Sequence, residues 1–390
     1  MSTPVRAPGG FPVVGVIGGG QLARMCAGPA TELGVTLSVL TDDPGSSAAQ
    51  VIPSAPVGAH TDMAAVRAFA RECDVVTFDH EHVPQEILAA LVEDGVTVHP
   101  SPGALLHAQD KLVMRRVLTD AGTPCPPWRA AGSREEVEAF AAEVGWPIVA
   151  KTPRGGYDGK GVLVAAAIED LQEWLARADE QGEQLLLEAK VPFVRELAVL
   201  LARSPSGQAA AWPVVETVQT DGICTEVIAP APGLSEESAR AATLIGLDVA
   251  AELGVTGVMA VELFELADGS VLVNELAMRP HNSGHWSMDG AVTGQFEQHL
   301  RAVLDLPLGS PEARAGWTVM ANVLGGEHED LYPTYRHVMA RDPGLRVHLY
   351  GKGVRPGRKI GHVTVCGEDL PALRERATHA ADYIQGVITQ

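Results

Sequence analysis

The sequence predicts an α/β protein of two or three domains, and three observations support that prediction. The chain has 390 residues, more than one ordinary hydrophobic core organises. Hydrophobic residues make up 46% of it, with 41 glycines, 27 prolines and no low-complexity tract, as is typical of a globular protein. Short apolar runs alternate with helical patterns from residue 13 to about residue 100, which indicates an open, largely parallel sheet.

Composition argues against several classes of protein. A formal net charge of −20 disfavours nucleic acid as a partner. No window is apolar for long enough to span a bilayer, and residues 1–12 lack the apolar centre of a signal peptide, so we expect them to be a disordered leader. The five cysteines are odd in number and form no C-x-x-C pair. We therefore expect reduced thiols in the cytoplasm rather than disulfides or a zinc site.

The first predicted strand, Val13–Ile17, runs into the glycine-rich segment Gly18–Ala23, and the second, Val35–Leu40, ends near Asp42. This order matches the loose dinucleotide fingerprint G-x-G-x-x-[GA]. Two other interpretations stay open: a tight strand–helix turn without a ligand, or a phosphate of another molecule at the helix N-terminus. The alternation then continues through a helix at Met63–Arg71, a strand at Val75–Phe78 and a helix at Pro84–Glu93.

Residues 77–82 lie past a strand end, at the expected lip of the crevice of such a sheet. His80 and His82 bracket Glu81, as metal ligands sometimes do. Neighbours along an extended chain point apart, however, which favours the interpretation that these are surface histidines. Glu81 is the residue that we expect to contact a substrate.

The second predicted unit contains a glycine-rich flap. A helical segment, 101–122, and a proline-rich linker, 123–127, precede a capping box at Ser133 and Glu136. A strand then ends at Lys151, and residues 155–161 contain four glycines, so their N–H groups can approach phosphates closely. No GK[ST] opens a helix, which excludes a P-loop. The alternative is a flexible hairpin connection, which would not need lysines at 151 and 160.

Further strands are predicted at 185–188 and 195–202, and the second contains Glu196. A carboxylate in a buried strand needs a hydrogen-bonding partner, for which a ribose is one candidate. A long amphipathic helix, Ser235–Leu253, follows and ends at Gly254.

Two apolar runs, Val258–Leu266 and Val271–Leu276, flank Asp268-Gly269, which is a strong hairpin signal. A two-residue turn there would place Glu262 opposite Glu275, with Cβ atoms roughly 4.5–5.5 Å apart. Like charges in that position destabilise a hairpin unless they share a proton or a cation such as Mg²⁺. In the alternative register, slipped by one residue, one glutamate faces solvent.

Polar and turn-forming residues, 279–285, follow the second of these strands directly. Loops at strand ends are where α/β proteins place ligands, so this loop is the predicted centre of an active site.

The last eighty residues contain apolar runs at Val319–Leu324 and Arg346–Leu349, a strand at His362–Val365 and a closing helix. Between them, Lys352–Lys359 holds four cations in eight residues. A solvated basic loop is one interpretation. The other is a turn whose cations converge on one anion.

Several of these segments together resemble one family. They are Gly20-Gln21-Leu22, the flap GGYDGKG, the paired Glu262 and Glu275, NELAMRPHNSGHW and GKGVRPGRKIGHV. The resemblance, from about residue 13 to 385, is to N5-carboxyaminoimidazole ribonucleotide synthetases, ATP-grasp ligases of purine biosynthesis. It implies an ATP-grasp fold: a Rossmann-like domain at 13–110, an ATP-grasp domain at 111–307 with a flexible lid at about 125–190, and a small C-terminal domain at 308–390.

The resemblance also implies the reaction. Its members carboxylate 5-aminoimidazole ribonucleotide with bicarbonate and ATP through carboxyphosphate, giving ADP and phosphate. The implied cofactor is Mg²⁺, held by Glu262 and Glu275, and the implied assembly is a cytoplasmic homodimer. Arg279 would contact carboxyphosphate, with Lys151 and Asp158 as the other catalytic residues.

The binding residues carry over by motif. The implied ATP site consists of Lys111, Lys151, Gly156, Tyr157, Asp158, Gly159, Lys160, Gly161, Val162, Glu188, Ala189, Lys190, Val191, Glu196, Gln219, Asn274 and Glu275. The implied ribonucleotide site consists of Gln21, Leu22, Glu81, Asp158, His281, Asn282, Lys352, Arg358 and Lys359.

Three positions depart from the family pattern. Lys111 stands where arginine is common, which loses a bidentate fork. Gln219 stands where many members have histidine, and Met278 replaces a common proline. Ala277 argues against the dipeptide-ligase branch, which has an asparagine ligand at that offset.

Three other functions stay open. An NAD(P)-dependent oxidoreductase would rest on Gly18–Ala23 and Asp42, but leaves the flap, the glutamate pair and the basic loop unexplained. A nucleotide sensor would bind ATP without turnover. Another ATP-grasp ligase, using formate or an amino acid, would share the phosphate-activating residues.

Overall fold

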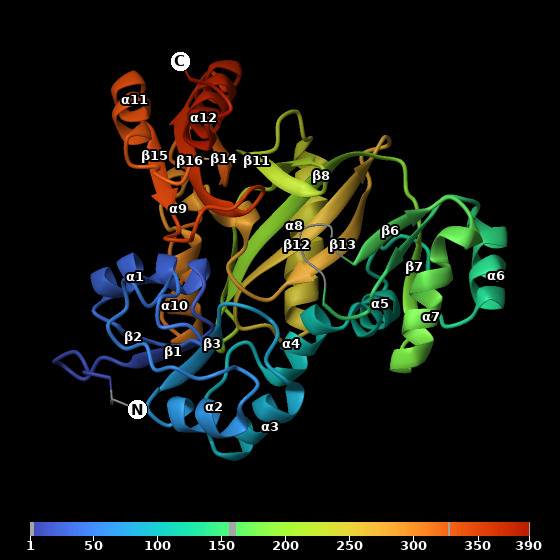
Figure 1. The fold of residues 1–390 in the computed structure, drawn as a ribbon, viewed down its shortest axis with the longest axis horizontal. Coiled ribbons are helices and arrows are strands. Elements are labelled where there is room, and N and C mark those ends of the chain that lie inside the picture. The colour runs from blue at the N-terminus through green and yellow to red at the C-terminus, as the bar shows by residue number, and fades with distance from the viewer. Residues whose placement is uncertain (1–3, 156–160, 327, 390) are drawn as a thin grey trace.

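The computed structural model describes residues 4–155, 161–326 and 328–389, and in that part of the chain the strands form three sheets. A nine-stranded antiparallel sheet occupies the centre (Figure 1). A three-stranded parallel sheet lies at the N-terminal end, in blue, and a four-stranded antiparallel sheet lies to one side, in green. No helix within the described ranges has the length and apolarity to cross a membrane.

The N-terminal sheet has the order β2-β1-β3, all parallel, as the sequence predicted. Its strands are β1 (Val13–Ile17), β2 (Thr36–Leu40) and β3 (Val75–Phe78), and its helices are α1 (Gln21–Leu33), α2 (Met63–Ala70) and α3 (Gln85–Glu93). Every strand residue except Thr36 is buried, because helices cover both faces of a parallel sheet.

Residues 4–12, which we expect to belong to a disordered leader, make several contacts with this sheet in the structure. Arg6 donates to the Asp74 carboxylate at 2.6 Å, and the same carboxylate accepts the Val13 N–H at 2.7 Å. The Ala7 N–H donates to the Thr36 hydroxyl. These contacts connect the segment to β2 and to the ends of β1 and β3. Residues 1–3 of the expected leader lie outside the described residues.

The predicted helix at 101–122 is two helices, α4 (Pro102–Gln109) and α5 (Lys111–Asp120). Asp110 between them is extended, with φ −132° and ψ 106°. Its carboxylate accepts the N–H groups of Leu112 and Val113 at 3.0 and 3.1 Å, so Asp110 caps the second helix. The break places Lys111 in the first turn of α5, where its N–H donates to the Pro153 carbonyl at 2.8 Å.

The four-stranded sheet has the order β4-β7-β5-β6. Its strands are β4 (Trp128–Ala131), β5 (Ile148–Lys151), β6 (Val162–Ala165) and β7 (Leu185–Ala189), and α6 (Arg134–Val144), the 3-10 turn η1 (Ile168–Leu171) and α7 (Gln172–Gln181) accompany it. The predicted capping box is confirmed, since Ser133 and Glu136 bond each other reciprocally at the start of α6.

The central sheet has the order β13-β12-β8-β10-β11-β14-β16-β15, and β9 pairs with β8. The strands are β8 (Phe193–Arg203), β9 (Ala209–Ala211), β10 (Val215–Thr220), β11 (Ile223–Ala229), β12 (Gly257–Leu266), β13 (Val271–Ala277), β14 (Trp317–Leu324), β15 (Arg346–Leu349) and β16 (Lys359–Gly367). The remaining elements are α8 (Glu236–Glu252), the 3-10 turn η2 (Asn282–Gly284), α9 (Ser287–Gly290), α10 (Gln295–Val303), α11 (Thr334–Arg341) and α12 (Leu370–Gln385).

The two faces of this sheet carry different partners. Val199 and Leu201 face α8, since a Cβ on Gly246 of that helix would approach them to 2.8 and 3.1 Å. Ala198 of β8 faces the opposite side of the sheet and pairs with Glu262 of β12. Alternation along the strands therefore separates a face covered by α8 from a face that holds the paired glutamate.

Candidate active site

Glu262 and Glu275 are directly paired across β12 and β13, as predicted. The predicted turn, however, is wrong by one residue: the Leu266 N–H bonds the Ser270 carbonyl, so the loop has three residues. Leu263 accordingly pairs with Val273, which is one residue out of the predicted register. A bulge at Asn274 adds one residue to β13 and restores the pairing of the glutamates.

The opposed carboxylates repel. Burial, followed by the charges of Glu275 and Glu196, raises the pKa of Glu262 to about 7. Within the described ranges no three His, Cys, Asp or Glu side chains are grouped to hold a metal ion on their own. Mg²⁺ usually takes only one or two carboxylates and completes its shell with water and phosphate oxygens. The two glutamates therefore fit such an ion together with a nucleotide.

Two lysines lie beside the bulge. Lys111 Nζ approaches Glu275 Oε1 to 3.2 Å and donates to the Gly155 carbonyl at 3.1 Å. Lys151 Nζ donates to Asn274 Oδ1 at 2.9 Å. The bulge thus presents Asn274 and Glu275, which are consecutive, to cations from α5 and β5.

Glu188 is buried in an ion-pair network that the sequence did not predict. Arg115, fully buried on α5, donates to Glu188 Oε1 at 2.6 Å and to the Asn274 carbonyl at 2.6 Å. Lys151 Nζ lies 2.8 Å from Glu188 Oε2. Burial opposes ionisation of Glu188, but the two cations outweigh it and hold its pKa below the usual range. Glu188 thus positions Lys151, and its place in the ATP site stays a prediction.

The other predicted ATP-site residues border the same region. Burial raises the pKa of Glu196, and a hydrogen bond from Gln219 and the charge of Lys151 oppose that rise. Ala189 ends β7, with Lys190 exposed and Val191 half-buried after it. Val162 begins β6, and the carbonyl of the preceding Gly161 accepts the Thr152 N–H at 3.0 Å. Gly156, Tyr157, Asp158, Gly159 and Lys160 lie outside the described residues.

The loop after β13 is held by Glu81. Its Oε1 accepts the Met278 N–H at 2.8 Å, and its Oε2 lies 3.5 Å from Arg279 Nε. Glu81, which we expected to contact substrate, thus also orients Arg279, the predicted carboxyphosphate contact.

His281 and Asn282 present polar groups toward the glutamates and β11. His281 Nε2 lies 3.5 Å from Glu262 Oε1, and its Nδ1 accepts the Ser283 N–H, so Nε2 carries the proton. Burial, followed by the charges of Arg279 and Lys359, lowers the pKa of His281 to about 3, so the ring is neutral. Both amide atoms of Asn282 are buried without a well-formed hydrogen bond to the described residues, and the side chain lies beside the Cys224 thiol, where it opposes the rise in pKa that burial causes.

The basic loop reaches the N-terminal domain. Lys352 Nζ donates to Gln21 Oε1, which joins two predicted ribonucleotide contacts. Arg358 is exposed and donates to the Gly353 carbonyl at 3.3 Å. Lys359 begins β16, and its charge acts on His281, Glu262 and the Cys224 thiol. Leu22, beside Gln21, is buried in α1.

The glycine fingerprint has a structural explanation. Asp79, at the end of β3, accepts the Ala23 N–H at 2.8 Å and so fills the N-terminus of α1 with the protein's own carboxylate. A Cβ on Gly20 would lie 2.0 Å from Asp79 Oδ2. The glycine is thus required by Asp79, and the exposed Asp42 has no such role. These contacts favour a tight strand–helix turn without a ligand over a dinucleotide-binding site.

His80 and His82 do not belong to a group of three or more potential metal ligands within the described ranges. Instead, His80 packs against His82 and His60 with ring centroids 5.3 and 4.6 Å apart.

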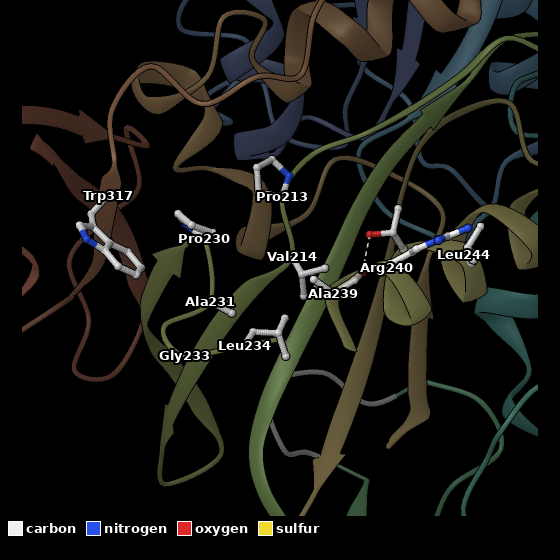
Figure 2. Close-up of a pocket in the computed structure, with 11 residues that line it drawn as sticks. Pro213, Val214, Pro230, Ala231, Gly233, Leu234, Ala239, Arg240, Leu244 and Trp317 are labelled. Atoms are coloured by element: carbon white, nitrogen blue, oxygen red, sulfur yellow. Dashed lines mark hydrogen bonds between the residues drawn. The ribbon is translucent and has the colours of Figure 1, made fainter. Parts of the chain in front are cut away.

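A cavity of about 490 Å³ lies elsewhere, between the β11–α8 connection, α8 and Trp317 (Figure 2). Its walls are mostly apolar, from Val214, Leu234 and Leu244, with Arg240 at one side. None of the predicted site residues lines it. The reacting groups are therefore to be sought on the other face of the sheet, around Glu262.

Three family models match the chain. The ribonucleotide synthetase preATP-grasp domain matches residues 12–109, the ATP-grasp domain residues 116–296, and the phosphoribosylaminoimidazole carboxylase C-terminal domain residues 318–376. The N5-carboxyaminoimidazole ribonucleotide synthase of Mycobacterium bovis is 54% identical over 376 residues, covering 96% of this chain and 88% of its own. The chain belongs to the N5-carboxyaminoimidazole ribonucleotide synthase family. It is an ATP-grasp ligase.

Other members of the N5-carboxyaminoimidazole ribonucleotide synthase family agree. The synthase of Corynebacterium ammoniagenes is 46% identical over 381 residues, covering 96% of this chain and 92% of its own. A crystal structure from Aspergillus clavatus in complex with ADP and 5-aminoimidazole ribonucleotide has a TM-score of 0.87 at 32% identity, covering 96% of this chain and 99% of that one. The synthetase of Thermus thermophilus has a TM-score of 0.84 at 37% identity, covering 95% of this chain and 98% of that one.

Proposed function

We propose that the chain catalyses the reaction for which its family is named, the ATP-dependent carboxylation of 5-aminoimidazole ribonucleotide, with bicarbonate as the carbon source. The observation that carries this proposal is the convergence on one region of paired carboxylates, Lys111 and Lys151 on one side and Arg279, His281 and Lys359 on the other. Such an arrangement would bind two anionic substrates side by side, and the two carboxylates would hold the metal ion.

Mg²⁺ fits at Glu262 and Glu275. When bound, it supplies positive charge to the phosphate oxygens of ATP, which stabilises the charge developed during phosphoryl transfer. Lys151, fixed by Glu188 and Asn274, adds a charge that needs no reorganisation during reaction.

The chemistry needs two displacements. A bicarbonate oxygen attacks the γ-phosphorus, an O–P bond forms, the bond to ADP breaks, and carboxyphosphate results. The amine nitrogen of the ribonucleotide then attacks the carboxyl carbon, phosphate leaves, and the nitrogen loses a proton. Arg279, oriented by Glu81, contacts carboxyphosphate. His281 can donate from Nε2, because its ring is neutral and its Nδ1 accepts the Ser283 N–H.

The ribonucleotide lies between the N-terminal domain and the basic loop. Gln21 and Lys352 hold one another across that boundary, and Asn282, Arg358 and Lys359 border it. The resemblance implies that the glycine-rich flap excludes water from carboxyphosphate; its residues 156–160 lie outside the described residues. We include Asp158 of that flap among the catalytic residues, on the resemblance alone.

The assembly and location are part of the proposal. The resemblance supports a homodimer, which sedimentation would test. The five free cysteines support the cytoplasm.

The deciding experiment measures phosphate release from ATP with Mg²⁺, bicarbonate and aminoimidazole ribonucleotide, and omits each in turn. We expect full release only when all are present. Release that depends on formate or an amino acid instead would identify another ATP-grasp ligase. ATP binding without any release would identify a nucleotide sensor.

A further inference from the structure

Unpartnered polar atoms gather behind the loop that carries His281 and Asn282. Nine buried side-chain atoms in the described residues have no hydrogen-bond partner. Two belong to Asn282, which the proposed function gives to the substrate. Five more come from residues that are all at most 3% exposed and lie on the segment 285–286 or on β14 and β16: His285 Nε2, Trp286 Nε1, Asn322 Oδ1, His362 Nε2 and Thr364 Oγ1.

These five residues share one compartment of the fold. Asn322 pairs directly with His362 across β14 and β16, so both point to the same face, and Thr364 follows His362 on that face. The His285 ring stacks on the His362 ring at a centroid separation of 5.1 Å. Met320, which pairs with Thr364, lies in the same hydrophobic cluster as Trp286.

The proton on His285 is fixed by geometry. Gln295 Oε1 must accept the His281 N–H at 2.9 Å, so Gln295 Nε2 is the donor to the His281 carbonyl and to His285 Nδ1 at 2.7 Å. His285 Nδ1 therefore accepts, and Nε2 carries the hydrogen. Burial lowers the pKa of His285 and of His362 well below the usual range, so each ring is neutral and has a single N–H.

Both donors and acceptors are unsatisfied. His285 Nε2 and Trp286 Nε1 can only donate, while Asn322 Oδ1 can only accept because Asn322 Nδ2 already donates to the Cys224 carbonyl at 2.9 Å. An anion would leave the Asn322 oxygen unpaired, and a cation would be repelled by the two N–H groups. Water satisfies both kinds of group, and leaving each one unpaired costs about 1–3 kcal/mol.

We propose that buried water molecules occupy the boundary between residues 285–286 and strands β14 and β16, and that they support the substrate loop from behind. The waters act on the substrate loop through His285, because Gln295 joins His285 to both backbone groups of His281. Thr364 and His362 are then positioning residues for ribonucleotide binding. This last step rests on the proposed function; the hydration itself does not.

Thr364→Val tests the proposal because it should change Tm in opposite directions in a hydrated and in a dry compartment. If the Thr364 hydroxyl bonds a buried water, the substitution removes that bond and lowers Tm by about 1–3 °C. If the compartment is dry, it replaces an unsatisfied hydroxyl with a methyl group and raises Tm. Thr318→Val is the matched control, since Thr318 is equally buried on the same strand pair and its hydroxyl already has a partner in Cys366 Sγ at 3.4 Å.

Two further measurements complete the test. A crystal structure of the unmodified protein should show ordered solvent within hydrogen-bonding distance of His285 Nε2 and His362 Nε2. Thr364→Val should raise the KM for the ribonucleotide about two- to fivefold and leave the KM for ATP unchanged. Thr318→Val should leave both KM values unchanged. A raised Tm together with no solvent at these nitrogens would overturn the hydration. Solvent at the nitrogens with an unchanged KM would overturn the supporting role, and an inactive unmodified protein would overturn the proposed function alone.

Discussion

Glu262 on β12 lies opposite Glu275 on β13 because an extra residue, Asn274, offsets a three-residue turn. The bulge has a second effect. It lets Asn274 meet Lys151 while the next residue, Glu275, meets Lys111. In a regular strand, consecutive side chains would point to opposite faces. The bulge therefore determines both the carboxylate pair and its cations.

Glu262→Gln should abolish turnover and leave the protein folded, because one of the two carboxylates for Mg²⁺ is lost. Its effect on stability without Mg²⁺ has a defined sign. The folded-state pKa of Glu262, about 7, is above its ordinary value of 4.5, so the folded state binds more protons between these values. Stability therefore falls as pH rises from about 4.5 to about 7.

Denaturant titrations across that pH range without Mg²⁺ should show a shallower fall for Glu262→Gln than for the unmodified protein. Glu252→Gln, an exposed residue of α8, serves as the control and should change neither slope nor turnover. Normal turnover of Glu262→Gln at low Mg²⁺ would remove the metal assignment.

Arg115→Met should destabilise the protein by about 3–5 kcal/mol, because it leaves Glu188 buried with Lys151 as its remaining charge partner. The neighbouring Arg116 is exposed, so Arg116→Met should have almost no effect. Chemical denaturation measures both. Equal small effects would show that the buried network contributes nothing to stability.

Gly20→Ala should cost about 1–3 kcal/mol, because the new methyl group overlaps the Asp79 carboxylate at the start of α1. Gly103→Ala in α4 meets no atom within 4 Å and should instead stabilise the helix by about 0.5–1 kcal/mol. Thermal unfolding compares the two variants.

Titration of the unmodified protein with NADH or NADPH at millimolar concentration should show no binding. Saturable binding would restore the hypothesis that the protein is an oxidoreductase.

Arg358→Ala should raise the KM for aminoimidazole ribonucleotide about ten- to a hundredfold, because a charge-assisted hydrogen bond to the 5′-phosphate contributes about 1.5–3 kcal/mol. The KM for ATP should not change, and the effect should shrink with the dephosphorylated nucleoside. Arg355→Ala, an exposed cation of the same loop, is the matched control. A raised KM for ATP alone would mean that the ATP site and the ribonucleotide site are assigned the wrong way round.

Much of the fold was predictable because local signals agreed with the tertiary structure. The strand at Arg346–Leu349 has the predicted bounds, and the capping box at Ser133 begins α6. The break at Asp110 was missed because helical periodicity continues across it. The β10–β11 hairpin was also missed, although Asp221-Gly222, both with positive φ, is the same dipeptide signal that identified β12 and β13.

The site residues that belong to sequence motifs were predicted. Those that act only through tertiary contacts were missed. Arg115 lies in an ordinary helical pattern, so nothing local distinguishes it from the exposed Arg116. Asp79 likewise shows no local sign that it fills the N-terminus of α1. Both act on residues distant in sequence, and single-sequence patterns report only near neighbours.

Strand β14 pairs with β11, so the C-terminal strands continue the sheet that carries the glutamate pair. A chain ending before Trp317 would leave β11 as an open edge with unpaired N–H and C=O groups, a template for association with other chains. The C-terminal segment thus covers the edge of β11, and exchanging this segment between relatives requires a strand that pairs with β11 in the same way.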